Sequence, residues 1–132
     1  MHPFLKNVLA VLAGICVGGI VNFGIILISS SIVAPPEGVD VSSVESIKAN
    51  IHLYKPIHFL FPFLAHAIGT LAGALLTIKL SKNIKSAYVI ALIFLYGGIS
   101  MVTQVPGPQW FSVLDLGVAY IPMAWLATKI SG

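Results

Sequence analysis

The chain has 132 residues, of which 58% are hydrophobic and 8% are charged. A soluble domain usually carries about 25% charged residues, and a small globule has too much surface to hide so many apolar side chains in its core. The net charge of +3 is the balance of seven basic and four acidic residues. The basic residues are all lysines scattered along the chain, which argues against nucleic-acid binding. We therefore expect lipid to cover most of the protein.

The first apolar run extends over residues 4–32 and exceeds the roughly 20 residues that a helix needs to cross a bilayer core. It is longer than the hydrophobic region of a signal peptide, and Pro35 directly after Ala34 opposes cleavage at that small residue. We therefore expect a retained transmembrane helix. Because proline cannot continue a helix, Pro35 and Pro36 are expected to end it.

Residues 33–56 form a polar outer loop between the first and second apolar segments. Within it, the run Ser42-Ser43-Val44-Glu45 fits a capping box, and Val44, Ile47 and Ile51 recur at helical spacing. This pattern predicts a short extracytoplasmic amphipathic helix that lies on the membrane surface. A second interpretation makes the same segment a lid over a cavity.

Three further helices are expected at about 57–80, 86–103 and 110–130. Together with the first they predict an all-α fold, an integral membrane four-transmembrane-helix bundle that forms a single membrane domain over residues 1–132. Pro62 and Pro122 each remove a helix hydrogen bond and predict kinks in the second and fourth helices.

The lysines predict the orientation of the bundle, because four crossings place both termini on one side. Five of the seven lysines fall on that side, which by the positive-inside rule is the cytoplasm. These five are Lys6, Lys79, Lys82, Lys85 and Lys129, whereas Lys48 and Lys55 fall on the other side. We therefore expect cytoplasmic N- and C-termini.

A few polar residues interrupt the apolar segments, and Asn22, His66, Thr70 and Asp115 form a candidate polar pocket. A carboxylate at membrane depth costs about 2.5–3.5 kcal/mol on insertion scales and therefore faces protein or water. His66 is the ionisable residue of another helix at a level comparable with Asp115, so we expect these two side chains to face each other, with Asn22 nearby. Two interpretations stay open: a structural hydrogen bond between helices, or a proton or ion relay that opens outward.

Small residues recur at four-residue spacing on the first two helices, a pattern that lets helix backbones approach closely in lipid. The first set is Ala10, Gly14 and Gly18, and the second is Ala65, Gly69 and Gly73. These faces either pack the two helices together within one chain or form a seam between copies or with a larger complex.

No resident cofactor or metal is predicted. His58 and His66 are eight residues apart on one helix, about 12 Å along its axis, which is too far to share an ion. A mixed site at the outer surface from Glu45, His52 and His58 is an alternative, although His58 is expected to be an interfacial residue.

Two segments carry a resemblance to a known group of proteins. The run PPEGVDVSSVESIKANIHLYKPIHFLFPFLAHAIGTLAGA, residues 35–74, and the run IPMAW, residues 121–125, resemble segments of small, uncharacterised bacterial four-helix membrane proteins. The resemblance covers about half of the chain and implies a bacterial inner membrane. It implies no substrate, mechanism or functional residue.

Three functions are compatible with these patterns. The first is a small non-enzymatic accessory or self-associating subunit, a homo-oligomer or part of a larger membrane complex, which uses its glycine-faced helices. The second is a small transporter or channel with an outward-facing pocket around Asn22, His66 and Asp115. The third is a membrane enzyme that acts on a lipid or quinone.

Overall fold

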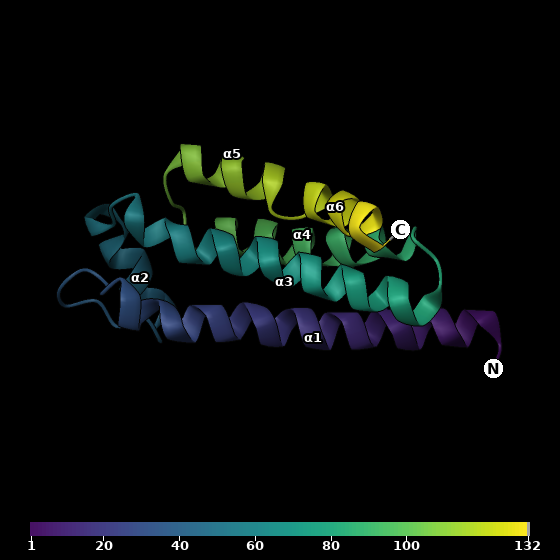
Figure 1. Ribbon diagram of the computed structural model, residues 1–132. Coiled ribbons are helices and arrows are strands. Elements are labelled where there is room, and N and C mark those ends of the chain that lie inside the picture. The colour runs from purple at the N-terminus through teal and green to yellow at the C-terminus, as the bar shows by residue number, and fades with distance from the viewer. Residues whose placement is uncertain (132) are drawn as a thin grey trace.

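The computed structural model describes residues 1–131, so the last residue of the predicted domain, Gly132, lies outside the described residues. All regular elements of the described part are helices (Figure 1). Four segments are long and apolar enough to cross a membrane, namely Pro3–Ile32, Ile57–Ser81, Ser86–Gln104 and Gln109–Ser131. Their ends agree with the predicted helix ranges to within one residue.

Helix α3 (Ile57–Ser81) is the centre of the bundle, since α1 (Pro3–Ile32) and α4 (Ser86–Gln104) both pack against it. Helices α5 (Gln109–Val118) and α6 (Ile121–Ser131) also contact α3 and complete the arrangement. The start of α1 and the end of α6 lie at one end of the bundle, called here the terminal end, and α2 (Val44–Asn50) lies at the other, called here the α2 end (Figure 1).

The glycines of α1 and α3 bring the two helix backbones into direct contact. A Cβ atom added at Gly18 would lie 2.7 Å from the carbonyl oxygen of Gly69, and one at Gly73 would lie 2.6 Å from that of Gly14. Real Cβ atoms do not approach other atoms so closely, so these positions require glycine. The predicted small-residue faces therefore meet each other within one chain, and the alternative that these faces form a seam between copies is wrong.

The remaining small residues of the two faces are also buried. Ala10 and Ala65 have almost no exposed surface, and the Thr77 hydroxyl donates to the carbonyl oxygens of Gly73 at 2.8 Å and Ala10 at 3.3 Å. Close packing of the backbones and these hydrogen bonds therefore hold α1 on α3.

An alanine-rich core closes the terminal end of the bundle. Helices α3, α4 and α6 contribute buried alanines that surround Ile90. These alanines are Ala74, Ala87, Ala91, Ala124 and Ala127. Their small side chains allow the three helices to pack closely at this end.

The capping box predicted for the loop is shifted by one residue. Ser43 is the N-cap of α2, and its hydroxyl accepts a hydrogen bond from the Ser46 backbone N–H at 3.2 Å. Ser42 is unavailable as the cap because its hydroxyl and backbone N–H both donate to the Asp40 carboxylate, at 2.6 and 3.0 Å. These two bonds, the side-chain one first, hold the pKa of Asp40 below its usual range.

The fourth span is not one continuous helix, and the prediction of a single kinked helix over 110–130 is wrong in this respect. At the end of α5, the Ala119 N–H donates to the Asp115 carbonyl oxygen at 3.0 Å. At the start of α6, the Ala124 N–H donates to the Tyr120 carbonyl oxygen, also at 3.0 Å. Pro122 has no N–H to donate to the Val118 carbonyl, which explains why the helix breaks here. Pro62, in contrast, is accommodated inside α3.

Substitution of Gly18 by leucine should destabilise the bundle, because the added side chain would force α1 away from Gly69. We expect a loss of about 1–3 kcal/mol in the free energy of unfolding, which is typical of overpacking. Unfolding in mixed micelles with a denaturing detergent would measure it. Gly24→Leu is the matched control, because nothing lies within 4 Å of a Cβ built at Gly24. Equal stability of the two variants would contradict the assigned α1–α3 contact.

Candidate functional site

The predicted contact between His66 and Asp115 is present. His66 Nδ1, from α3, lies 2.8 Å from Oδ1 and 3.0 Å from Oδ2 of Asp115, from α5. The Asp115 side chain is 4% exposed, whereas that of His66 is 24% exposed. The carboxylate is thus withdrawn into the bundle, and the imidazole lies between it and open space.

Tyr120 is a third member of this site, and the sequence analysis missed it. Its hydroxyl lies 3.5 Å from Asp115 Oδ2, and its ring is stacked on the His66 ring with 5.9 Å between centroids. Residues five apart in a continuous helix point about 140° away from each other. The break between α5 and α6 removes this restriction and allows Tyr120 to turn back towards Asp115.

A signal for Tyr120 does exist in the sequence. A tyrosine buried in an apolar segment usually needs a partner for its hydroxyl, and Asp115 is the nearest acidic residue. Tyr120 can reach Asp115 only if the helix between them is interrupted. Pro122, two residues after Tyr120, indicates this interruption.

His66 Nε2 is available for a ligand. Because Nδ1 contacts the carboxylate, it carries the hydrogen in both the neutral and the protonated imidazole. Within residues 1–131, no side chain or backbone group forms a hydrogen bond with Nε2. The pair therefore has one side fixed by the protein and one side open to a cavity.

Asn22 lies across from this pair on α1. A Cβ added at Gly69, one turn after His66, would lie 3.1 Å from the Asn22 Cβ. The side-chain oxygen Oδ1 of Asn22 is buried and has no hydrogen-bond partner in the described part of the chain. Such an unpaired buried acceptor is unfavourable by about 1–3 kcal/mol and calls for a donor.

Thr70, in contrast, does not belong to the pocket, and its inclusion in the predicted set is wrong. Its side chain is fully buried, and its hydroxyl donates to the His66 carbonyl oxygen at 2.7 Å. A helical threonine commonly bonds to the carbonyl four residues earlier, and this bond turns the hydroxyl away from the cavities.

Two cavities meet at this site. The larger has a volume of about 460 Å³ and extends from Asp115 to the α2 end. The smaller has a volume of about 270 Å³ and lies between α1 and α4, against α3 and Tyr120. Both are lined by the same four residues, Asn22, His66, Gly98 and Met101. These four residues form the junction of the two cavities.

The α2 segment faces the larger cavity. Val44, Ile47 and Ile51, which the sequence places at helical spacing, all line it, together with Tyr54. The apolar residues of the segment therefore border the cavity, and its interpretations as a helix on the membrane surface and as a lid both stay predictions. Burial raises the pKa of Tyr54, so this side chain stays uncharged at the mouth of the cavity.

The three outer-surface residues do not come together. His58 Nδ1 accepts from the Lys55 backbone N–H at 2.8 Å, and its Nε2 lies 3.1 Å from the Ala34 carbonyl oxygen. This histidine thus connects the two ends of the loop, while Glu45 and His52 are exposed on it. Nowhere in residues 1–131 do three or more His, Cys, Asp or Glu side chains gather in a way that suits a metal ion. The alternative of a metal site from Glu45, His52 and His58 therefore has no geometric support.

No family model, curated protein or solved structure matches this chain. The function is therefore argued from the chemistry of the site.

Removal of His66 should destabilise the bundle more than removal of both partners. In His66→Ala the buried Asp115 carboxylate loses its hydrogen-bond donor, and leaving a buried polar group unpaired typically reduces stability by about 1–3 kcal/mol, and by more for a charged group. In the double variant, with Asp115→Ala added, no charge is left behind and part of this loss should be recovered. The measurement is the free energy of unfolding of the single and double variants. A double variant as unstable as His66→Ala would argue against a charge effect.

Proposed function

We propose that this protein is a small transporter that exchanges protons for an organic cation through its larger cavity. The observation that carries the proposal is the pair at the base of that cavity, a buried carboxylate with a titratable partner. This function is a specific form of the second function compatible with the sequence, a transporter with an outward-facing polar pocket.

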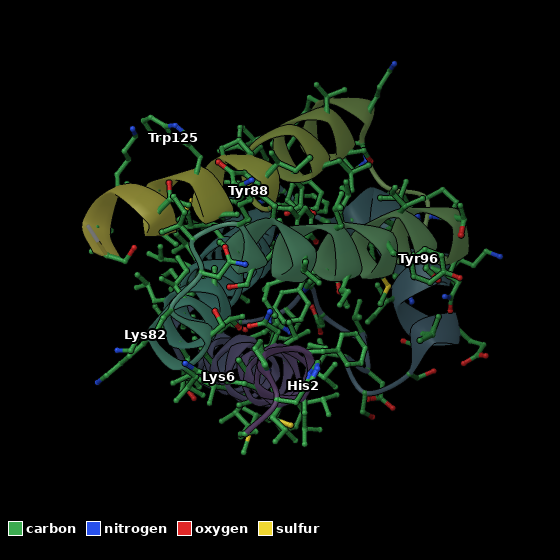
Figure 2. All side chains as sticks on the ribbon, turned by 90° about the vertical axis from the view of Figure 1, so that its right-hand side faces the viewer. His2, Lys6, Lys82, Tyr88, Tyr96 and Trp125 are labelled. Atoms are coloured by element: carbon green, nitrogen blue, oxygen red, sulfur yellow. The ribbon has the colours of Figure 1, made fainter. Side chains whose placement is uncertain are left out.

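The proposal places the bundle in a bacterial inner membrane with cytoplasmic termini, so that the larger cavity opens outward. The lysine distribution supports this orientation, and Figure 2, a view from the terminal end, labels Lys6 and Lys82 there. Lys48 lies in α2 at the opposite end, close in sequence to Glu37, Asp40 and Glu45. The resemblance of residues 35–74 to small bacterial membrane proteins supports the same location.

The charge of the site favours a cation. Asp115 is the one carboxylate among the residues that line the larger cavity within the described chain. When His66 is neutral, the base of this cavity carries a negative charge in apolar surroundings, which requires a countercharge. A proton on His66 or a positively charged solute can supply it, and the two repel each other. Binding of one therefore promotes release of the other.

The other groups that face the pair do not change this argument. Tyr120 packs on it from the break between α5 and α6, and Tyr54 and His58 are the titratable groups farther towards the mouth. From α1 and α4 the pair faces Asn22, Gly98 and Met101, none of which titrates. His66 is thus the group in direct contact with Asp115 that can carry a proton opposite the carboxylate.

The size and walls of the larger cavity suit such a solute. Its volume of about 460 Å³ falls within the range of small-molecule sites, about 300–1,000 Å³. Phe59 lines it and lies against Phe111, with 4.7 Å between ring centroids. Aromatic faces attract organic cations and are compatible with their apolar parts.

A second candidate is the accessory or self-associating subunit. It is favoured by α1, whose apolar surface is mostly exposed, with 11% of its most apolar stretch buried against the other helices. Its glycine faces cannot serve this role, because they are already packed against α3. Lipid covers such an exposed helix equally well, so the transporter is the stronger proposal.

The test is uptake of radiolabelled benzyltrimethylammonium into proteoliposomes with an acidic lumen. This cation cannot lose a proton and therefore cannot cross the lipid as a neutral amine. We expect uptake by the wild type and none by Asp115→Asn, because the amide offers no countercharge. Asp40→Asn, the matched change in the exposed loop, should transport normally. Equal uptake by Asp115→Asn and the wild type would contradict the proposal.

Accumulation of benzyltrimethylammonium should depend on His66, because the proposal lets this side chain carry the proton that is exchanged for the cation. In His66→Gln the amide still donates to Asp115 but cannot take up a proton. An acidic lumen should therefore no longer raise uptake above that in liposomes with equal inner and outer pH. His52→Gln, on the exposed loop, is the control. Uptake by His66→Gln that responds to the acidic lumen as the wild type does would contradict this role.

A further inference from the structure

The smaller cavity opens sideways, between α1 and α4. Two glycines that line it, Gly19 and Gly97, are exposed, so the cavity reaches the surface of the bundle there. A Cβ atom added at either glycine would meet nothing within 4 Å. Neither position needs glycine for close packing, in contrast to Gly14 and Gly18.

The opening exists because α1 packs along α3 and touches α4 sparsely. The two helices approach each other at Gly18 and Gly14, where an added Cβ would lie 2.7 Å from the Phe94 ring and 3.0 Å from Ile90. These contacts close the opening on the terminal side. From Gly18 towards the α2 end, α1 and α4 leave the opening that leads to the junction of the two cavities.

The surface around the opening is apolar. Ile20 and Phe23 on α1 and Tyr96 on α4 are among the most exposed large side chains (Tyr96 is labelled in Figure 2). Gly97 lies about 10 Å along the helix axis from the end of α4 at Gln104, and Gly19 lies about 20 Å from the end of α1 at Ile32. In a bilayer core of about 30 Å, the opening therefore faces hydrocarbon rather than water.

Asn22, at the junction, and Asp115, behind His66 at the base of the larger cavity, can both be satisfied by the same ligand chemistry. Asn22 Oδ1 is a buried acceptor without a donor in the described residues, and Asp115 carries a negative charge. A primary ammonium group has a positive charge for the carboxylate and N–H donors for Asn22 Oδ1. A quaternary ammonium satisfies Asp115 alone.

We propose that the smaller cavity is a lateral entrance for long-chain primary ammonium ions dissolved in the membrane. The head group binds at the junction, where it donates to Asn22 Oδ1 and pairs with Asp115, and the alkyl chain extends between Gly19 and Gly97 into the lipid. This inference rests on the proposed exchange of protons for organic cations, and it assigns the substrate class and the side from which the substrate arrives.

The first experiment blocks the opening. Dodecylammonium is added as a competitor of labelled benzyltrimethylammonium bound to the protein in nanodiscs. In Gly97→Leu, the concentration of dodecylammonium needed for half displacement should rise at least about tenfold, because the leucine occupies the path of the chain. Binding of benzyltrimethylammonium itself should stay unchanged, since it is held in the larger cavity.

The control is Gly117→Leu, an exposed glycine of α5 that lines neither cavity and also has nothing within 4 Å of an added Cβ. It should compete like the wild type. If Gly97→Leu does not fold, Gly19→Leu blocks the opening from the opposite wall, with Gly24→Leu as its control.

The second experiment removes the acceptor. Asn22→Leu should weaken dodecylammonium about tenfold, as expected for a lost hydrogen bond to a charged group. Dodecyltrimethylammonium, which has no N–H donor, should bind the variant and the wild type equally. Equal weakening of both amphiphiles would overturn the role of Asn22.

The outcomes separate this inference from the proposed function. If Gly97→Leu and Gly117→Leu compete alike, or if Gly97→Leu weakens both probes alike, the lateral entrance is overturned. Binding of benzyltrimethylammonium that depends on Asp115 would in these cases still support the exchange. If the wild type binds none of the probes, both proposals are overturned.

Discussion

The contact between the glycine backbones of α1 and α3 determines where the site lies. Gly18 packs on the Gly69 carbonyl, and Gly14 packs on Gly73 at the next turn towards the terminal end. Asn22 is one turn beyond Gly18 and His66 one turn before Gly69, so the same antiparallel register brings these two polar residues to one level. The packing motif and the polar site are consequences of a single helix pairing, and neither can move without the other.

Helix α3 uses two opposite kinds of contact on its two sides. Towards α1 it offers glycine and threonine, and towards α5 it offers His66, which holds the buried Asp115 carboxylate at 2.8 Å. Helix α1 packs closely on α3 but touches α4 only sparsely. The space left between α1 and α4 is the opening at Gly19 and Gly97. The structural and the functional interpretation of the His66–Asp115 pair are therefore compatible, because the bond that ties α3 to α5 also leaves Nε2 facing a cavity.

The sequence predicted those features that a single large free-energy contribution determines. Hydropathy located the four long apolar helices, because an apolar run of about 20 residues outweighs other local preferences. The cost of burying Asp115 similarly required a partner, and His66 was available at the right depth. Pro122 can either kink a helix or interrupt it, and packing of α6 against α3 and α4 decides between the two. The position of Tyr120 and the break before Ile121 follow from the interruption. The one-residue shift of the cap at Ser43 depends on a hydrogen bond to Asp40, which competes locally with the helix for Ser42.

The two ends of the bundle differ in their packing. At the terminal end, alanines of α3, α4 and α6 surround Ile90, whereas the larger cavity lies between His66 and the α2 end. In the proposed transport, a solute that moves from this cavity to the terminal end would have to pass the alanine core. The break at Ala119 and Tyr120 separates α6, which belongs to that core, from α5, which holds Asp115. Tyr120 lies in this break and its hydroxyl lies 3.5 Å from Asp115 Oδ2, so the break connects the alanine core to the polar site.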